Sequence, residues 1–297
     1  MKRFPGNIIT RNAVTPGGPG RDGAAPGVWS MDSALRYIQA GKWPIQGLIP
    51  ASQQEYISPG TYTWVCPANI TSVSVVCVGA GGSNAGGGGE LRYRNNISVT
   101  PGSSYTVIVG AATPFTFDPT TSPSGFSQFI NSSTCKAFGG NSGLGTSFGT
   151  GGSGGTGDGG GNGGSSGATD NGSSTGAYSA GGGAGGYSGN GGNGNNTSNG
   201  TNGAGGGGGG GSTMSYSVFG PYGGGVGIYG QGASGAGGTY NNVSQYNGKD
   251  GSVVAGLPSY FGYGSGYVGA TGAVRIIWGG NQVTRAFPST NTQNYNV

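Results

Sequence analysis

The side chains that most often carry catalysis or bind metal ions are scarce in this 297-residue chain. It contains no histidine, and its eight Asp and Glu residues are scattered along the sequence. General acid–base catalysis and metal binding draw mainly on these residue types. We therefore expect a protein that is not an enzyme and that needs no cofactor and no metal ion.

The three cysteines are Cys66, Cys77 and Cys135, and they do not have the spacing of a metal site. Cys77 lies in the apolar run of residues 73–78, where a thiol is typical of a small buried core residue. A disulfide is the alternative interpretation.

Aromatic side chains have the clearest potential for binding, because the chain contains 16 tyrosines, many of them near Asn, Ser and Gln. A flat ring beside amides and hydroxyls is typical of surfaces that bind sugars, and tyrosine provides contact area at low entropic cost. The alternative is that these rings shield the ends of the fold from water. The candidates for receptor contact are Tyr178, Tyr187, Tyr216, Phe219, Tyr222, Tyr240, Tyr246, Tyr260, Phe261 and Tyr263.

Most of these rings lie within or beside a tract, residues 139–238, that holds more than half of the 75 glycines. Such a tract has few side chains to bury, and glycine loses much backbone entropy on ordering. It is either a flexible linker or a bundle of extended helices of the polyproline II type. A single helix of that type makes no internal hydrogen bonds, so neighbouring helices must supply them, and only glycine lets the backbones approach closely enough.

Alternating apolar and polar residues predict β-strands before the tract, at 61–65, 71–78, 91–99 and 104–109. A further strand at 272–279, with Val274, Ile276 and Trp278 on one face, lies beyond the tract. The tract is therefore expected to leave a β module and return to it. We predict an all-β fold, a small antiparallel β-sandwich with an inserted glycine-rich, polyglycine-II-like helix bundle, preceded by an extended N-terminal arm and one short helix.

The predicted organisation has four parts. The short helix, between Trp29 and Pro44, is expected to begin after a Ser30 N-cap. Its side chains Trp29, Leu35, Ile38 and Trp43 are candidates for docking to another chain, because aromatic residues are enriched at such anchors; a local hydrophobic cluster is the alternative. The parts are 1–50 (arm and docking helix), 51–138 plus 268–280 (β-sandwich), 139–267 (glycine bundle with aromatic turns) and 281–297 (polar tail).

The charge pattern argues against nucleic acid and membranes as partners. A net charge of +4 is spread thinly along the chain and forms no basic stripe. No stretch approaches the ~18 to 20 apolar residues of a membrane helix. The N-terminus has no pattern of a secretory signal. We expect no nucleic-acid binding and no membrane insertion, and if the protein works outside a cell, a virus particle is one route by which it leaves.

The segment PGTYTWVCPANITSVSVVCVGAGG, followed by ELRYRNNISVTPGSSYTVIVG, the glycine tract and GAVRIIWG, resembles a glycine-rich domain of phage tail-fibre and other virion proteins. APGVWSMDSALRYIQAGKWP and VRIIWGGNQVTRAFPSTNT look like segments in structural proteins of marine cyanophage-type myoviruses. The glycine composition is similar to that of the polyglycine-helix sandwich in T-even-like tail-fibre tip adhesins, although the alternating β module departs from that pattern.

The resemblance implies a non-enzymatic phage fibre or adhesin subunit, a homotrimer that is assembled in the host cytoplasm and exposed on the virion surface. Its expected partners are other virion structural proteins and a host surface polysaccharide or outer-membrane protein. The alternative is an architectural virion protein, such as a head decoration, collar or neck fibre, that binds no receptor. A glycine-rich extracellular matrix protein is a third hypothesis, which the virion-like ends disfavour.

Overall fold

The computed structural model describes residues 32–33, 35–36, 51–84, 86–113, 125–143, 148–167, 179–213, 220–242, 244–280 and 285–289. In the N-terminal region the backbone is helical at 32–33 and 35–36. There Arg36 forms an exposed ion pair with Asp32, with 3.3 Å between nitrogen and oxygen. The remainder of the predicted arm and helix, and most of the polar tail, lie outside the described residues.

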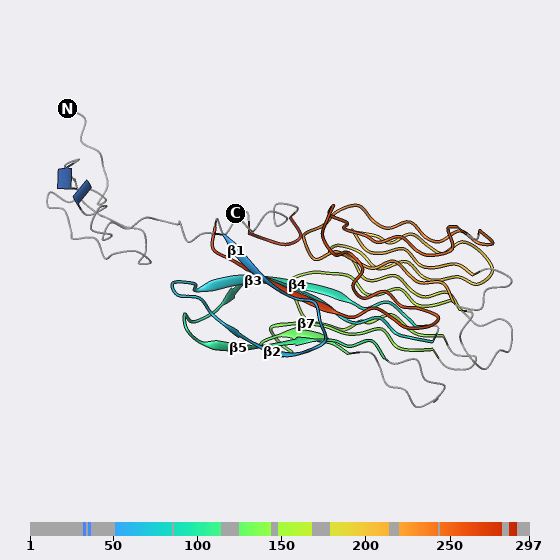
Figure 1. The fold of residues 1–297 in the computed structure, drawn as a ribbon, viewed down its shortest axis with the longest axis horizontal. Helices are drawn as coiled ribbons and strands as arrows, with labels where there is room; N and C mark the ends of the chain where they lie inside the picture. The colour runs from blue at the N-terminus through green and yellow to red at the C-terminus, as the bar shows by residue number, and fades with distance from the viewer. Residues whose placement is uncertain are drawn as a thin grey trace.

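The strands of the described chain form two antiparallel four-stranded sheets (Figure 1). The first sheet has the order β1 (Ser52–Tyr56), β8 (Ala273–Trp278), β3 (Ser72–Val78) and β4 (Leu91–Ser98). The second has the order β2 (Gly60–Val65), β5 (Ser104–Val109), β6 (Ser127–Phe129) and β7 (Cys135–Ala137). The predicted all-β fold is confirmed, including the pairing of β3 with the distant strand β8.

The first hydrophobic core fills the space between the two sheets. Alternate residues of β3 and β8 point into this core. They include Val73 and Val75 on β3 and the predicted Val274, Ile276 and Trp278 on β8. The Trp64 ring on β2 lies 5.6 Å from the Trp278 ring between centroids, which joins the two sheets. All three cysteines are buried here as free thiols. The prediction of Cys77 as a small core residue is confirmed.

A second core covers the opposite face of the first sheet. Val76, Val78, Leu91, Ala273 and Ile277 pack there against residues of the bundle and of the 285–289 segment, which are Ala184, Tyr187, Val226, Ile228, Tyr229, Phe261 and Phe287. Strands β3 and β8 are therefore buried on both faces, which explains their nearly continuous apolar sequences. The first sheet is the middle layer of the protein, and the bundle is anchored directly to it.

Arg275 is the charged exception on β8, and its side chain is completely buried. Its Nε donates to Gln53 Oε1 over 2.7 Å, and its Nη1 donates to the Ile228 carbonyl over 3.1 Å. The guanidinium also lies 4.6 Å from the centroid of the Tyr229 ring. This arginine joins β1, β8 and the bundle, because a buried charge is tolerated only where it is hydrogen-bonded on several sides.

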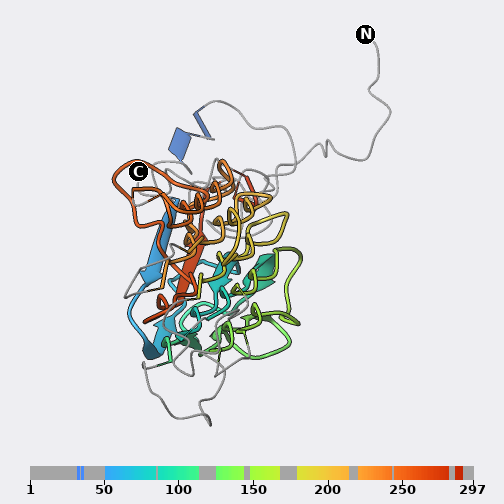
Figure 2. The ribbon, with the colours of Figure 1, turned by 90° about the vertical axis from the view of Figure 1, so that its right-hand side faces the viewer.

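The glycine-rich segments run side by side away from the sheets and back, as Figures 1 and 2 show. The segment 181–186 shows how they are joined. Its six amides donate in turn to Pro221, Gly86, Gly192, Gly224, Gly89 and Gly189, over 2.8 to 3.1 Å. The fourth, fifth and sixth amides thus return to the same three neighbouring segments as the first three, which is the period of a helix with three residues per turn.

The carbonyls of this segment repeat in the same way. Those of Gly181 and Ala184 accept from Gly211 and Gly208, and those of Gly182 and Gly183 accept from Gly264 and Gly164. Three neighbours bound through amides and three through carbonyls surround the segment. Segments 86–91 and 207–212 have the same three-residue alternation of partners. The predicted polyglycine-II-like bundle is therefore confirmed, and the described part of the tract is not a linker.

Close backbone approach explains why glycine fills the interior. A Cβ atom on Gly183 would lie 2.2 Å from the carbonyl oxygen of Gly208, and one on Gly182 would lie 2.0 Å from that of Gly164. Glycine is required there for space and not for an unusual φ, because neither residue has a positive φ. The bundle also includes residues 79–90, between β3 and β4, which the sequence analysis placed in the β module.

Asparagine and aspartate side chains complete the hydrogen bonding at the margins of the bundle, and they too recur every three residues. The Oδ1 atoms of Asn190 and Asn193 accept from the amides of Asn162 and Ser165 over 3.0 and 2.9 Å. The same spacing recurs in two other pairs, Asn199 with Asn202 and Asn247 with Asp250. Side chains that are three residues apart lie on one face of such a helix. Each pair therefore accepts the hydrogen bonds that the carbonyl groups of a neighbouring segment would accept inside the bundle.

Candidate functional site

Several turns meet at the end of the bundle away from the sheets, on the right in Figure 1 and toward the viewer in Figure 2. We call this end the distal end; its described turns lie near residues 84 and 86, 195–199, 240–242 and 244–246, and 265–268. Hydrogen bonds join them. The Asn84 amide donates to the Tyr267 carbonyl over 3.3 Å, and the Tyr240 amide donates to Asn199 Oδ1 over 2.8 Å. The four turns are thus joined in two pairs.

Four of the predicted contact residues lie at or beside the distal end. Tyr222 is 38 % exposed, and Tyr240 and Tyr246 are partly exposed. Tyr263 packs against Tyr222, with 5.6 Å between ring centroids, and its burial, the main cause, raises the pKa of its hydroxyl. The exposed ring of Tyr267, which the sequence analysis did not select, belongs to the same surface.

Tyr187 and Phe261 correct the sequence analysis, because they are buried in the second core at 1 % and 0 % exposure. The Tyr187 hydroxyl donates to the Gly227 carbonyl over 3.2 Å and accepts from the Gly230 amide over 3.0 Å. Burial, the largest cause, raises its pKa well above the usual value. Both rings cover the first sheet and cannot touch a receptor. Sequence alone did not separate them from exposed rings, because both kinds have polar and glycine neighbours.

The remaining predicted residues divide into two groups. Tyr260 is 50 % exposed, but its ring lies 5.1 Å from that of Phe261, beside the second core and away from the distal end. Leu35 is 50 % exposed on its helical turn. The others lie outside the described residues and stay predictions: Trp29, Ile38, Trp43, Tyr178, Tyr216 and Phe219.

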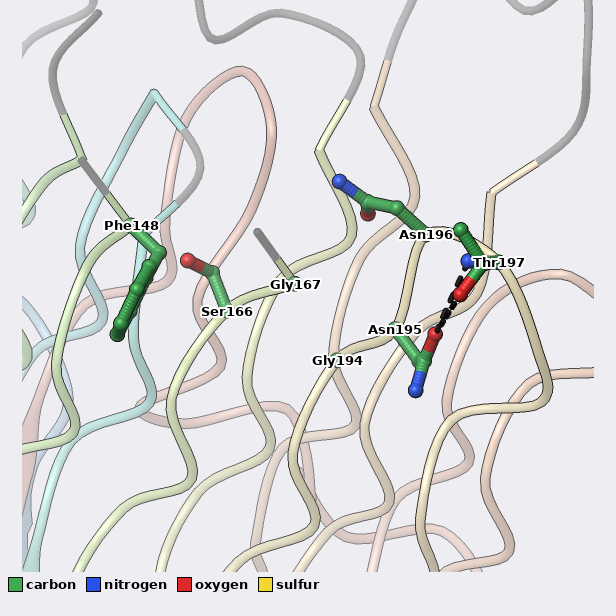
Figure 3. Close-up of a pocket in the computed structure, with 7 residues that line it drawn as sticks. All are labelled: Phe148, Ser166, Gly167, Gly194, Asn195, Asn196 and Thr197. Carbon is green, nitrogen blue, oxygen red and sulfur yellow. Dashed lines mark hydrogen bonds between the residues drawn. The ribbon is translucent and has the colours of Figure 1, made fainter. Parts of the chain in front are cut away.

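A pocket of about 270 Å³ opens at the distal end (Figure 3). It is lined by Phe148, Ser166, Gly167, Gly194, Asn195, Asn196 and Thr197, none of which is charged. Phe148 is 51 % exposed and forms an apolar wall. Phe148 was not among the predicted contact residues; its position as an isolated aromatic residue within the glycine tract was the signal that could have identified it.

The buried charges of the described residues have structural roles. The Glu90 carboxylate is fully buried and accepts hydrogen bonds from the amides of Phe138 and Gly155, over 2.9 and 3.0 Å. It also pairs with Arg92, whose Nε donates over 2.7 Å. A carboxylate enclosed in this way does not reach a substrate; instead it joins the start of β4, the end of β7 and the bundle segment at Gly155.

Within the described ranges, no group of three or more Cys, Asp and Glu side chains is placed to hold a metal ion. Over the same ranges, the structure has no helix with the length and apolarity needed to span a bilayer.

Among known proteins, a family model described as a glycine-rich domain matches residues 57–279. A search of curated proteins gave no match. The matched region includes β2 to β8 and the bundle, so it takes in the second sheet, all of the first sheet except β1, and the distal end.

Proposed function

The chain belongs to the glycine-rich domain family, and we propose, from its resemblance to virion proteins and from the exposed turns of its bundle, that it is a non-enzymatic phage fibre or adhesin subunit built to display a binding surface. In this proposal the N-terminal region docks the subunit to other virion proteins, and the distal end binds a receptor on the host surface. The observation that carries the proposal is the collection of exposed Tyr and Asn turns at one end of a densely hydrogen-bonded bundle.

The construction of the bundle suits display. Its segments are fixed by hydrogen bonds that lie between segments and not within them, so the turns can vary in sequence while the scaffold remains the same. Contact residues are commonly placed on turns that a rigid scaffold supports. Tyrosine and asparagine at these turns provide apolar contact area and adaptable hydrogen bonds without net charge.

The direction of the chain also supports the proposal. Strand β1 begins at Ser52, which pairs with Trp278 at the end of β8 farthest from the bundle. Strand β1 therefore begins at the end of the fold opposite to the distal turns (Figure 1). A subunit attached through its N-terminal region would direct its distal turns outward. Several copies on one particle, as in the proposed homotrimer, would raise the avidity of weak individual sites.

The test is binding of the purified full-length protein to host cells, measured with a fluorescent label by flow cytometry. The double variant Tyr222→Ser with Tyr240→Ser should bind at least about tenfold more weakly. Tyr260→Ser, which removes a more exposed ring (50 %, against 38 % for Tyr222) away from the distal end, is the matched control and should bind like the wild type. Absence of binding by the wild-type protein at saturating concentration would refute the adhesin and would favour an architectural virion protein. An equal loss of binding in the double variant and in Tyr260→Ser would refute the assignment to the distal end.

A further inference from the structure

The ends of three bundle segments enclose the distal pocket, and direct hydrogen bonds hold them in place. The Gly149 amide donates to Ser166 Oγ over 2.9 Å, and the Ser166 amide donates to the Gly149 carbonyl over 2.9 Å. The Gly194 amide donates to the Ser165 carbonyl over 2.9 Å, which fixes the third segment. The walls of the pocket are therefore formed before any ligand arrives, so little ordering would accompany binding.

The pocket combines one apolar wall with several polar groups. Phe148 provides the apolar wall, and Figure 3 shows the Ser166 hydroxyl beside its ring. That hydroxyl accepts from Gly149, so its own hydrogen can be donated to a ligand. Asn195 Oδ1 accepts from the amides of Thr197 and Ser198, both over 3.0 Å. Its amide nitrogen points away from that turn in Figure 3 and can donate as well.

The lining residues define the chemistry of a matching ligand. An aromatic wall favours a ligand with an apolar C–H face, and the hydroxyl and amide groups favour a ligand that carries hydroxyls. The lining has no charged side chain to pair with an ionic ligand. A volume of about 270 Å³ lies just below the range of pockets for drug-sized ligands, which suits a single ring better than an extended peptide.

We propose that this pocket is a subsite for one neutral sugar ring, stacked on Phe148 and hydrogen-bonded by Ser166, Asn195 and Thr197. The inference rests on the proposed function, because it specifies the class of host receptor as an uncharged surface polysaccharide. A single subsite of this size binds weakly, with a Kd on the order of 1 mM. Repetition of the subsite among subunits would supply the avidity that adhesion requires.

Saturation-transfer NMR on the full-length protein tests the subsite directly. The probes are free glucose, galactose, mannose and N-acetylglucosamine, with glucuronic acid as the charged counterpart. We expect transfer to the ring protons of at least one neutral sugar and much weaker transfer to glucuronic acid. An absence of transfer to every neutral sugar, or stronger transfer to glucuronic acid, would overturn the inference.

Two variants and one control connect binding to the pocket. Phe148→Ala should weaken the sugar affinity at least about tenfold with little effect on folding, because this ring is half exposed. Thr197→Val preserves the side-chain shape and should weaken binding, because it removes a hydroxyl that can accept from the sugar and that donates to Asn195 Oδ1 over 3.3 Å. Tyr260→Ala removes an exposed ring away from the distal end and should leave sugar binding unchanged. If Phe148→Ala binds sugar like the wild type, the subsite is elsewhere.

The cell-binding assay separates failure of the subsite from failure of the proposed function. If Phe148→Ala binds host cells as strongly as the wild type while Tyr222→Ser with Tyr240→Ser does not, the adhesin stands and the sugar subsite is refuted as its receptor site. If the wild type binds no host cell, the adhesin is refuted. In that case the sugar NMR decides by itself whether the pocket is a saccharide site.

Discussion

Gly183→Ala tests whether interior glycines are required for close packing or for backbone freedom. Gly183 has no positive φ, so its conformation is open to alanine. If space were available, alanine would stabilise the protein by about 0.4–1 kcal/mol, because it reduces the entropy of the unfolded chain. The new Cβ, however, would lie 2.2 Å from the Gly208 carbonyl oxygen, whereas ordinary contact begins at 3.4 Å.

The magnitude follows from the displacement that the clash requires. The two segments would have to separate by about 1.2 Å, the difference between these two distances. Such a shift strains the hydrogen bonds from Gly208 to Ala184 and from Gly192 to Gly208, which are now 3.0 and 2.8 Å long. Each buried group that loses its partner costs about 1–3 kcal/mol, and overpacking costs a similar amount. We therefore expect a loss of about 3–5 kcal/mol in the free energy of unfolding.

Gly256→Ala is the matched control, because position 256 requires glycine for its backbone conformation and not for lack of space. Gly256 has a φ of +79°, and a Cβ there would meet nothing within 4 Å. Alanine should cost about 1–2 kcal/mol through the left-handed conformation alone. Scanning calorimetry on both variants should show a decrease in Tm of roughly 6–15 °C for Gly183→Ala and only a few degrees for Gly256→Ala. An unchanged or raised Tm for Gly183→Ala, or a larger loss for Gly256→Ala, would refute the close-packing argument.

Four further predictions concern the margin, the two cores and the N-terminal region. Asn193→Ala should lower the urea midpoint by the equivalent of about 1 kcal/mol, because Ser165 loses an acceptor, whereas Asn193→Asp should retain most of the stability. Burial raises the pKa of the Tyr187 hydroxyl in the folded state, so the unfolded chain loses this proton at a lower pH than the folded protein does. The urea midpoint should therefore fall as the pH rises beyond about 10. Tyr187→Phe should reduce that fall, and it should cost about 1–3 kcal/mol at neutral pH because the Gly230 amide loses its acceptor. The buried cysteines should react with a chromogenic thiol reagent only when the protein unfolds, so rapid reaction under native conditions would contradict the first core. Deletion of residues 1–44 should preserve the calorimetric transition but abolish incorporation into particles, and normal incorporation would refute the docking assignment.

The strands with alternating patterns could be predicted from the sequence, but those without such a pattern could not. Strands β2, β3, β4, β5 and β8 match the predicted ranges closely. Strand β1, with the sequence SQQEY, is a polar edge strand, and it is recognised by its pairing with β8. Strands β6 and β7 have three residues each, too few for a period to emerge. Their position depends on tertiary pairing.

The bundle was predictable as an arrangement, but its connections were not. Composition favoured glycine helices, yet which segments are neighbours depends on hydrogen bonds between residues far apart in sequence, such as Gly182 with Gly86. For the same reason, the sequence did not distinguish Tyr187, which covers the first sheet, from Tyr222 at the distal end. The recurrence of asparagine every three residues at Asn190 and Asn193 was a readable signal of the helical period that the sequence analysis did not use.

The most direct test of the proposed function is competition for adsorption. Under the proposal, phage particles carry this protein; such particles are mixed with host cells in the presence of excess purified protein, and the fraction of particles left unadsorbed is counted. We predict that the wild-type protein blocks adsorption in a concentration-dependent way, and that the double variant Tyr222→Ser with Tyr240→Ser does not. Adsorption that stays unchanged at saturating wild-type protein would contradict the proposal that the distal end binds the host receptor.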